Sequence, residues 1–368
     1  MPAMRTVLLI LNFGGPQRAG EVEPFLFELF RDPDVIPIPG PPIVREAFAD
    51  LISGLRWPRI AKQYAEIGGG SPLVPMTYAQ GEALQAALAA DGIELELHYA
   101  MRYTRPFTRT ALEAIKAEGP AHIIALGMYP HYSFATLGSS YAELFRQHQA
   151  LKMTADWPIT YVPAFPVDTG YIDALTETVQ EALAAIPPDI KPHLLFSAHG
   201  LPVSFVEKGD PYPRHIQATV LAVVEKLGWT GPHSLAWQSK VGPAAWLTPS
   251  TETALRRLGA TNTEAVLVVA VSFVGDHIET MFELDIEYRE VAEEAGIHHW
   301  FRAPALNTRP TFIQALATQV KNALQKEAPC GVGCCRLPRP AGMKGLRVVP
   351  GGCQPCPLPE YSLPAPGA

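Results

Sequence analysis

The segment AVLVVAVSFVGDHIETMFELDIEY, residues 265–288, joins an apolar run directly to a stretch rich in acidic residues. The run at 265–271 is short, contains many β-branched residues and has no polar side chain, which is typical of a strand buried in a parallel sheet. The spacing of apolar residues over 277–295 predicts a helix. A strand that leads straight into a helix is the repeating unit of an α/β fold.

The same alternation of short apolar runs and helical stretches recurs along most of the chain. Further helices are predicted at 77–90, 109–117, 168–185 and 213–227. Eight strands are predicted, four on each side of 164–168, because each apolar run is short and β-rich. They lie at 6–12, 94–99, 122–126, 159–162, 193–197, 233–237, 265–271 and 298–301.

This order predicts two similar halves. The stretches LLILNFGGP at 8–16 and HLLFSAHGLP at 193–202 each end a first strand in a glycine turn. We therefore expect an α/β protein of two doubly wound, Rossmann-like domains, residues 1–165 and 166–328, whose four-stranded parallel sheets face a central cleft. Any two α/β domains share such turns, so unrelated halves are the alternative. A tail rich in cysteine and proline follows at 329–368.

Five acidic residues follow the strand at 265–271 at steps of three or four. On a helix that begins near Asp276 they would share one face, where like charges repel each other. Either water solvates this face, or the face serves cations and protons. Two histidines favour the second interpretation, since His277 lies beside the acids and His199 ends another predicted strand, where open parallel sheets bind ligands. The five acids are Asp276, Glu279, Glu283, Glu287 and Glu290.

Seven short motifs make the chain similar to one known family. They are LNFGGP at 11–16, IGGGSPL at 67–73, MRY at 101–103, YPHYS at 129–133, FSAHGLP at 196–202, WQSKVGP at 237–243 and DHIET at 276–280. In this combination the chain resembles the bacterial ferrochelatases, lyases that insert ferrous iron into a porphyrin in haem biosynthesis. The resemblance implies a chelatase-type fold, with Fe²⁺ and either protoporphyrin IX or coproporphyrin III as substrates.

The resemblance also implies roles for the acids and histidines. Insertion requires that two pyrrole protons leave while the metal exchanges water for ring nitrogens. Imidazole accepts protons near neutral pH and binds Fe²⁺, so His199 and the opposing Glu279 are expected to take protons and bind the metal, and which does which stays open. Glu283 and Glu287 are expected to carry protons or metal along the helix, which makes an unusually wide turn in the family. Asp276 and His277 are expected to set the first turn.

A porphyrin needs apolar or aromatic walls and cationic or hydroxyl groups for its propionates. Seven residues are expected to supply them, mostly by their places in the motifs, although an aromatic residue of this kind is more often part of a core. At the position of Phe13 the family often has tyrosine with coproporphyrin and methionine or leucine with protoporphyrin, so phenylalanine leaves the porphyrin open. The seven are Phe13, Arg56, Ser71, Arg102, Tyr103, Tyr129 and Trp237.

Composition narrows the range of partners. The net charge is −7 and no basic cluster occurs, which argues against binding of nucleic acid. Neither a targeting sequence nor an apolar run of about 20 residues is found, so we expect a cytoplasmic protein that does not span a membrane. The apolar segments 24–30 and 35–39 are expected either to touch a membrane surface beside the pocket or to pack in the core. The oligomeric state stays open.

All five cysteines lie in the tail. Thiols crowded into one segment of a chain that otherwise has none indicate metal ligation rather than disulfides. Some ferrochelatases hold a [2Fe–2S] cluster near the carboxyl end, and four of the five cysteines could ligate one. Tetrahedral zinc and idle thiols are the alternatives. The five are Cys330, Cys334, Cys335, Cys353 and Cys356.

Two other functions remain alternatives. A non-catalytic porphyrin- or haem-binding protein could have this fold, but it would not need proton acceptors facing a metal route. A chelatase that inserts cobalt or nickel into another tetrapyrrole could also have it, but those relatives place paired histidines at the metal site, whereas here His199 is expected to face Glu279.

Overall fold

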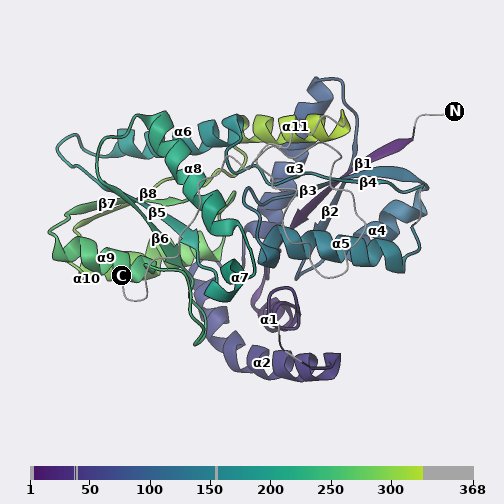
Figure 1. The fold of residues 1–368 in the computed structure, drawn as a ribbon, viewed down its shortest axis with the longest axis horizontal. Coiled ribbons are helices and arrows are strands. Elements are labelled where there is room, and N and C mark those ends of the chain that lie inside the picture. The colour runs from purple at the N-terminus through teal and green to yellow at the C-terminus, as the bar shows by residue number, and fades with distance from the viewer. Residues whose placement is uncertain (1–3, 37, 39, 154–155, 326–368) are drawn as a thin grey trace. The chain divides into compact units, whose positions relative to one another are not determined.

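The computed structural model describes residues 4–36, 38, 40–153 and 156–325. Within them, eight strands form two four-stranded sheets that are parallel throughout, in the orders β2-β1-β3-β4 and β6-β5-β7-β8 (Figure 1). The predicted strands and the α/β class are therefore confirmed. The strands are β1 (Arg5–Asn12), β2 (Glu96–Met101), β3 (Ala121–Gly127), β4 (Ile159–Tyr161), β5 (His193–His199), β6 (His233–Gln238), β7 (Ala265–Ala270) and β8 (His299–Arg302).

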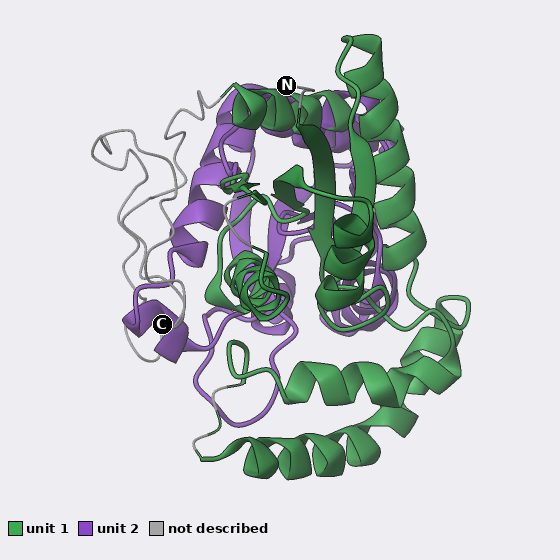
Figure 2. Cartoon of the chain, turned by 90° about the vertical axis from the view of Figure 1, so that its right-hand side faces the viewer, with its two compact units in different colours: residues 1–164, 313–355 green, residues 165–312, 356–368 purple. Residues whose placement is uncertain are grey.

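The chain forms two compact units (Figure 2). Unit 1 contains the chain up to Ala164 and the described residues from Ile313 onward, and unit 2 contains Phe165–Phe312. In both units the first strand lies between the second and the third, so the predicted similarity of the halves is confirmed in their topology. The predicted domains 1–165 and 166–328, and a cleft faced by both sheets, stay predictions.

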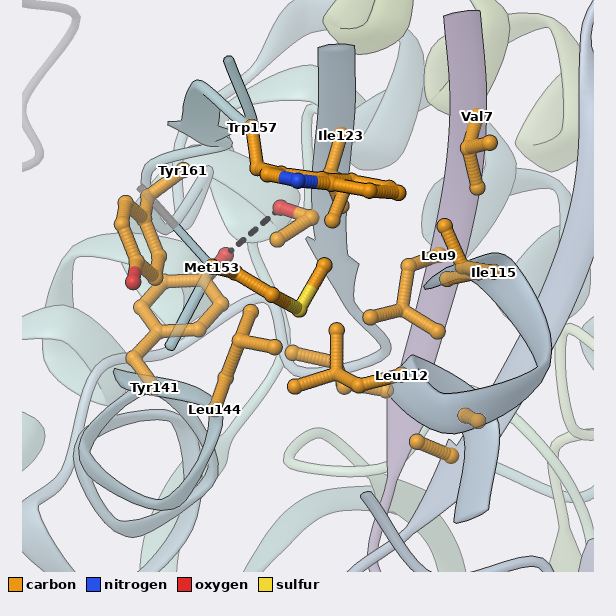
Figure 3. Close-up of a cluster of buried hydrophobic side chains, with 14 of the residues drawn as sticks. Val7, Leu9, Leu112, Ile115, Ile123, Tyr141, Leu144, Met153, Trp157 and Tyr161 are labelled. Atoms are coloured by element: carbon orange, nitrogen blue, oxygen red, sulfur yellow. Dashed lines mark hydrogen bonds between the residues drawn. The ribbon is translucent and has the colours of Figure 1, made fainter. Parts of the chain in front are cut away.

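Helices cover both faces of the sheet in unit 1. They are η1 (Ala19–Glu21), α1 (Val22–Phe30), α2 (Pro42–Glu66), α3 (Leu73–Ala90), α4 (Thr108–Ala117), η2 (Phe134–Gly138), α5 (Ser139–Ala150) and most of α11 (Pro310–Leu324). Leu112 of α4 and Leu144 of α5 pack with Leu9 of β1 in one buried cluster (Figure 3). On the other face, a Cβ on Gly81 of α3 would lie only 2.9 Å from Ile10 Cδ1. Alternate residues of β1 therefore serve opposite faces, as a strand requires.

Unit 2 has the same layered arrangement. Its helices are α6 (Thr169–Ala185), α7 (Val203–Glu207), α8 (Tyr212–Leu227), α9 (Thr251–Ala260), η3 (Glu279–Glu287) and α10 (Tyr288–Glu294). Leu255 of α9 and Ala292 of α10 pack with Leu195 and Val266 of the sheet, while α6 and α8 lie on the opposite side (Figure 1).

A π-helix follows the third strand of each unit, η2 in unit 1 and η3 in unit 2. Periodicity predicts an α-helix over 277–295, but residues 279–287 form a π-helix and 288–294 an α-helix. The wide turn implied by the family resemblance is thus present. The π-helix carries three of the five acids, Glu279, Glu283 and Glu287, whereas Asp276 precedes it and Glu290 lies in α10. π-Helices are rare and occur frequently at functional sites.

The apolar segment 24–30 is partly buried, and the described residues of 35–39 are half-buried. Phe25, Leu26 and Phe30 of α1 are buried, so core packing holds for these three. No helix among the described residues is long and apolar enough to cross a bilayer. Exposed large apolar side chains gather instead on α2, at Ile43, Val44, Phe48, Leu51, Leu55 and Trp57.

Candidate functional site in unit 2

The carboxyl ends of β5 and β7 form the centre of the candidate site. The chain leaves β5 toward β6, whereas β7 lies on the other side of β5, which makes this the switch point where open α/β sheets bind ligands. The backbone N–H of His199, the last residue of β5, donates to Ser272 Oγ (3.0 Å), two residues beyond the end of β7. The position after His199 requires a glycine, because a Cβ on Gly200 would lie only 2.8 Å from the backbone oxygen of Gln238.

The imidazole of His199 is held in one tautomer. Its Nδ1 lies 2.7 Å from Gly200 O, and because a carbonyl oxygen can only accept, Nδ1 carries the hydrogen and Nε2 keeps its lone pair. The rings of Trp246 and Phe273 lie 6.5 Å from the imidazole centre, and Tyr212 Oη donates to His199 O (3.1 Å). Nε2 is therefore suited to act as a base or a metal ligand.

His277 and Glu279 form a close pair just after β7, with His277 Nε2 3.2 Å from Glu279 Oε2. His277 Nδ1 lies 3.0 Å from Gly275 O and thus carries the hydrogen, so Nε2 and the carboxylate direct lone pairs at each other. Burial lowers the pKa of His277, and a charge on His199 acts in the same direction, while Glu279 raises it. Because the imidazole tends to stay neutral, the pair is suited to hold one shared proton or one metal cation.

Glu283 of η3 is held by two residues at the end of β6. Gln238 Nε2 (3.0 Å) and Ser239 Oγ (2.5 Å) both donate to Glu283 Oε2, and Gln238 Nε2 also donates to Glu279 O (3.0 Å). Ser239 has a φ of +63°, an uncommon conformation for a residue with a side chain. Burial, followed by the charge of Glu279, raises the pKa of Glu283 to about 8. Its carboxyl can therefore gain and lose a proton near neutral pH.

In unit 1, Phe13, Arg102 and Tyr103 lie together after β1 and β2. The Phe13 ring is 4.5 Å from the Tyr103 ring, and the Arg102 guanidinium is 5.0 Å from the same ring. Arg102 Nη2 (2.7 Å) and Tyr103 Oη (2.6 Å) both contact Oδ2 of Asp32, whose side chain is 1% exposed. The charge of Arg102 is thus balanced by Asp32 within unit 1.

The four other predicted porphyrin contacts lie on different elements of the two units. Ser71 lies against the turn after β1, since a Cβ on Gly15 would be 2.7 Å from Ser71 Oγ. Tyr129 follows β3, and burial raises the pKa of its hydroxyl. Arg56 of α2 lies 5.5 Å from an aromatic ring of α1. Trp237 is 3% exposed within β6, so its ring packs inside unit 2.

Several residues of these groups are not found from sequence alone. Gln238 and Ser239 lie within the WQSKVGP motif, so that motif was a usable signal for both. Asp32 has no such signal, because it meets Tyr103 from 71 positions away. Arg302, which contacts the loop before η3, also stands outside every motif. The predicted cysteine ligands lie outside the described residues.

Comparisons with known proteins identify the family of the chain. The model of the family described as ferrochelatase matches residues 5–324. A ferrochelatase of Synechocystis sp. is 43% identical over 327 residues, covering 89% of this chain and 84% of that protein. One of Gloeobacter violaceus is 45% identical over 317 residues, covering 85% and 96%. The structure of SirB from Bacillus subtilis with Fe³⁺ shares the fold, with a TM-score of 0.52 at 10% identity over 88% of this chain and 97% of that one. The chain belongs to the ferrochelatase family.

Proposed function

We propose that His199, Glu279 and Glu283 perform the metal insertion of this ferrochelatase. A ferrochelatase is a lyase that inserts Fe²⁺ into a porphyrin in haem biosynthesis, with the release of two protons. The observation that supports these roles is the lone pair on His199 Nε2, whose tautomer is set by Gly200 O at 2.7 Å. Phe273 contacts both this imidazole and that of the His277–Glu279 pair.

His199 is the proposed acceptor of pyrrole protons. Each of two pyrrole N–H groups must lose its proton as the nitrogen binds Fe²⁺, and imidazole is an efficient base near neutral pH. Since Nδ1 faces Gly200 O, Nε2 is the ring nitrogen that is placed to take a proton. The Nδ1–H group keeps donating its hydrogen bond to Gly200 O. This bond orients the ring and stabilises the imidazolium that forms.

Glu279 is the proposed ligand for incoming Fe²⁺, the metal substrate. Carboxylate oxygen and imidazole nitrogen both ligate Fe²⁺, so the 3.2 Å gap between Glu279 and His277 offers a place where a cation replaces a shared proton. Glu283 is the proposed next acceptor along η3. With a pKa of about 8 it can take up that proton and release it again.

Porphyrin binding is proposed for the seven residues that the motifs predict. Phe13 supplies an apolar wall, which Tyr103 and Arg102 support from behind, because Asp32 engages their polar atoms. Arg56 and Ser71 are proposed partners for propionates, and Tyr129 and Trp237 are proposed wall residues. Since Phe13 has no hydroxyl group, both protoporphyrin IX and coproporphyrin III remain candidate substrates.

Anaerobic assays with Fe²⁺ and each of the two porphyrins test this function. We expect the absorption spectrum of the metallated product with at least one porphyrin, and the ratio of the two rates gives the preference. Tight porphyrin binding without insertion of any metal would instead indicate a carrier. Insertion of cobalt or nickel into another tetrapyrrole, without activity toward Fe²⁺, would indicate the other class of chelatase.

A [2Fe–2S] cluster in the tail is a separate proposal. It depends on the five cysteines alone, and the family match ends at residue 324, before the first of them. Protein purified without oxygen should contain iron and acid-labile sulfide in equal amounts and show visible absorption. Bound zinc without sulfide would support the tetrahedral alternative, and absence of both would support idle thiols.

Peripheral membrane contact is proposed for α2, because Ile43 is 72%, Leu51 60% and Leu55 69% exposed. Co-sedimentation with lipid vesicles should weaken when Leu51 and Leu55 are both replaced by serine. Leu221→Ser is a matched control, since Leu221 is 50% exposed on α8. Equal binding of all variants would argue against this role of α2. The cytoplasmic location stays a prediction.

A further inference from the structure

We propose that Arg302 is a positioning residue for metal insertion, which fixes the turn carrying Asp276 and His277 to the π-helix η3, whose first residue is Glu279. The proposal rests on the function proposed for Glu279 and adds a residue that determines its place. Arg302 is the last residue of β8 and is paired in register with Val268 of β7. The pairing of β8 with β7 therefore fixes the backbone position of Arg302.

The guanidinium of Arg302 joins two points of the chain on either side of Glu279. Its Nε donates to Asp285 Oδ1 (2.6 Å) and its Nη2 to Asp285 Oδ2 (2.8 Å), within η3. Its Nη1 donates to Asp276 Oδ1 (3.2 Å), before η3. A planar guanidinium can make a bidentate pair and a third bond at once, whereas an ammonium group cannot reproduce this geometry.

Asp276 is in turn hydrogen-bonded to two further residues, one of which holds the backbone of His277. Asn307 Nδ2 donates to Asp276 Oδ2 (2.9 Å), and the Asp276 N–H donates to Asn307 Oδ1 (3.0 Å). Thr280 Oγ1 donates to Asp276 Oδ1 (3.1 Å), while the N–H of His277 donates to Thr280 Oγ1 (3.0 Å). Hydrogen bonds thus connect Arg302 to His277 without a break.

Charge explains why this place needs arginine. The side chain of Arg302 is 16% exposed, and those of Asp276 and Asp285 are 22% and 38% exposed. Without the guanidinium, Asp285 would add uncompensated charge to a helix that already carries Glu279, and Asp276 would do so just before its first turn. A π-helix is rare outside a supporting tertiary context, so we expect η3 to shift when this support is lost. Glu279 would then lose its alignment with His277.

The test compares variants of the full chain for Fe²⁺ and porphyrin separately. Arg302→Met removes the charge but keeps a side chain of similar length. Arg302→Lys keeps the charge but cannot make the bidentate contact with Asp285. Asp285→Asn weakens the same ion pair by removing the charge of the carboxylate. Arg289→Met is the matched control, because Arg289 forms an exposed i,i+4 pair with Glu293 on the adjoining α10. Anaerobic measurements give kcat, KM for Fe²⁺ and, by equilibrium dialysis, the Fe²⁺ dissociation constant, while fluorescence quenching gives porphyrin affinity.

We expect Arg302→Met to lower kcat/KM for Fe²⁺ by about 10- to 100-fold and to weaken Fe²⁺ binding, with porphyrin affinity unchanged within about twofold. Arg302→Lys and Asp285→Asn should lie between this variant and the wild type, and Arg289→Met should match the wild type. Wild-type values for folded Arg302→Met, or equal losses for Fe²⁺ and porphyrin, would overturn the proposal. If Arg302→Met does not fold, Asp285→Asn decides by the same criteria. A wild-type protein that binds Fe²⁺ but inserts none would refute the proposed function, while the dialysis constants would still decide the role of Arg302.

Discussion

Replacing Glu283 by glutamine should change how the stability of the protein depends on pH. Glutamine keeps the shape of a protonated glutamate and can still contact Gln238 and Ser239, but it cannot ionise. In the wild type, burial and the charge of Glu279 raise the pKa of Glu283 from its usual 4.5 to about 8. The variant therefore isolates the cost of ionising this one carboxyl inside the folded protein.

The magnitude follows from proton linkage. Between pH 4.5 and about 8 the folded protein holds a proton that the unfolded chain has released, so the free energy of unfolding falls as pH rises through this window. At about 1.4 kcal/mol per pH unit, the full effect would be roughly 5 kcal/mol. Because the side chain is partly accessible to water, we expect about 2–3 kcal/mol.

Urea unfolding of both proteins at pH 5 and pH 9 measures this effect. From pH 5 to pH 9, the wild type should lose about 2–3 kcal/mol of stability relative to Glu283→Gln. Glu293→Gln, which removes an exposed carboxyl of α10, is the control for a general effect of charge. A difference between wild type and Glu283→Gln that is the same at both pH values would refute the raised pKa and the proton exchange proposed for Glu283.

Three further predictions concern the other groups. His199→Ala should lower kcat at least about 100-fold, because the base is lost, while porphyrin binding measured by fluorescence stays intact; unchanged turnover would exclude His199 as the acceptor. Ser239→Ala should raise the pKa of Glu283 further by removing a donor to its ionised form, so the acid limb of the pH–rate profile should move to higher pH. Asp32→Asn should cost about 3 kcal/mol in urea unfolding, because it leaves Arg102 buried without its counter-charge; a loss below about 1 kcal/mol would show that the pair is well solvated.

The fold class could be predicted from sequence because its signals are local. Apolar runs such as 265–271 and the glycine turns after 6–12 and 193–197 mark strands and their ends within a few residues. Predicted and observed strands differ only at their ends, for example at β5, which extends to His199. The similarity of the two halves was also visible as a repeated order of strands and helices, and the structure gives both units the same strand order.

The detail of the site could not be predicted in the same way. Periodicity over 277–295 does not distinguish a π-helix from an α-helix, and the contacts that η3 receives from Ser239 after β6 and from Arg302 of β8 come from distant segments. Only the structure shows that Trp237 is buried within unit 2, because β6 directs its side chain inward; its place at a porphyrin wall stays a prediction. A motif position does not say on which face of a strand a side chain lies.

The sequence by itself determined that this chain is an α/β protein, which residues carry the family's motifs, and that His199 and Glu279 are the residues to examine. Only the tertiary structure decided the tautomers of His199 and His277, the raised pKa of Glu283 and the contacts of Arg302. The physical reason is that strands and motifs arise from neighbours along the chain. Proton affinity and orientation depend instead on exclusion of water and on partners from distant segments, such as Ser239, which lies 44 positions from Glu283.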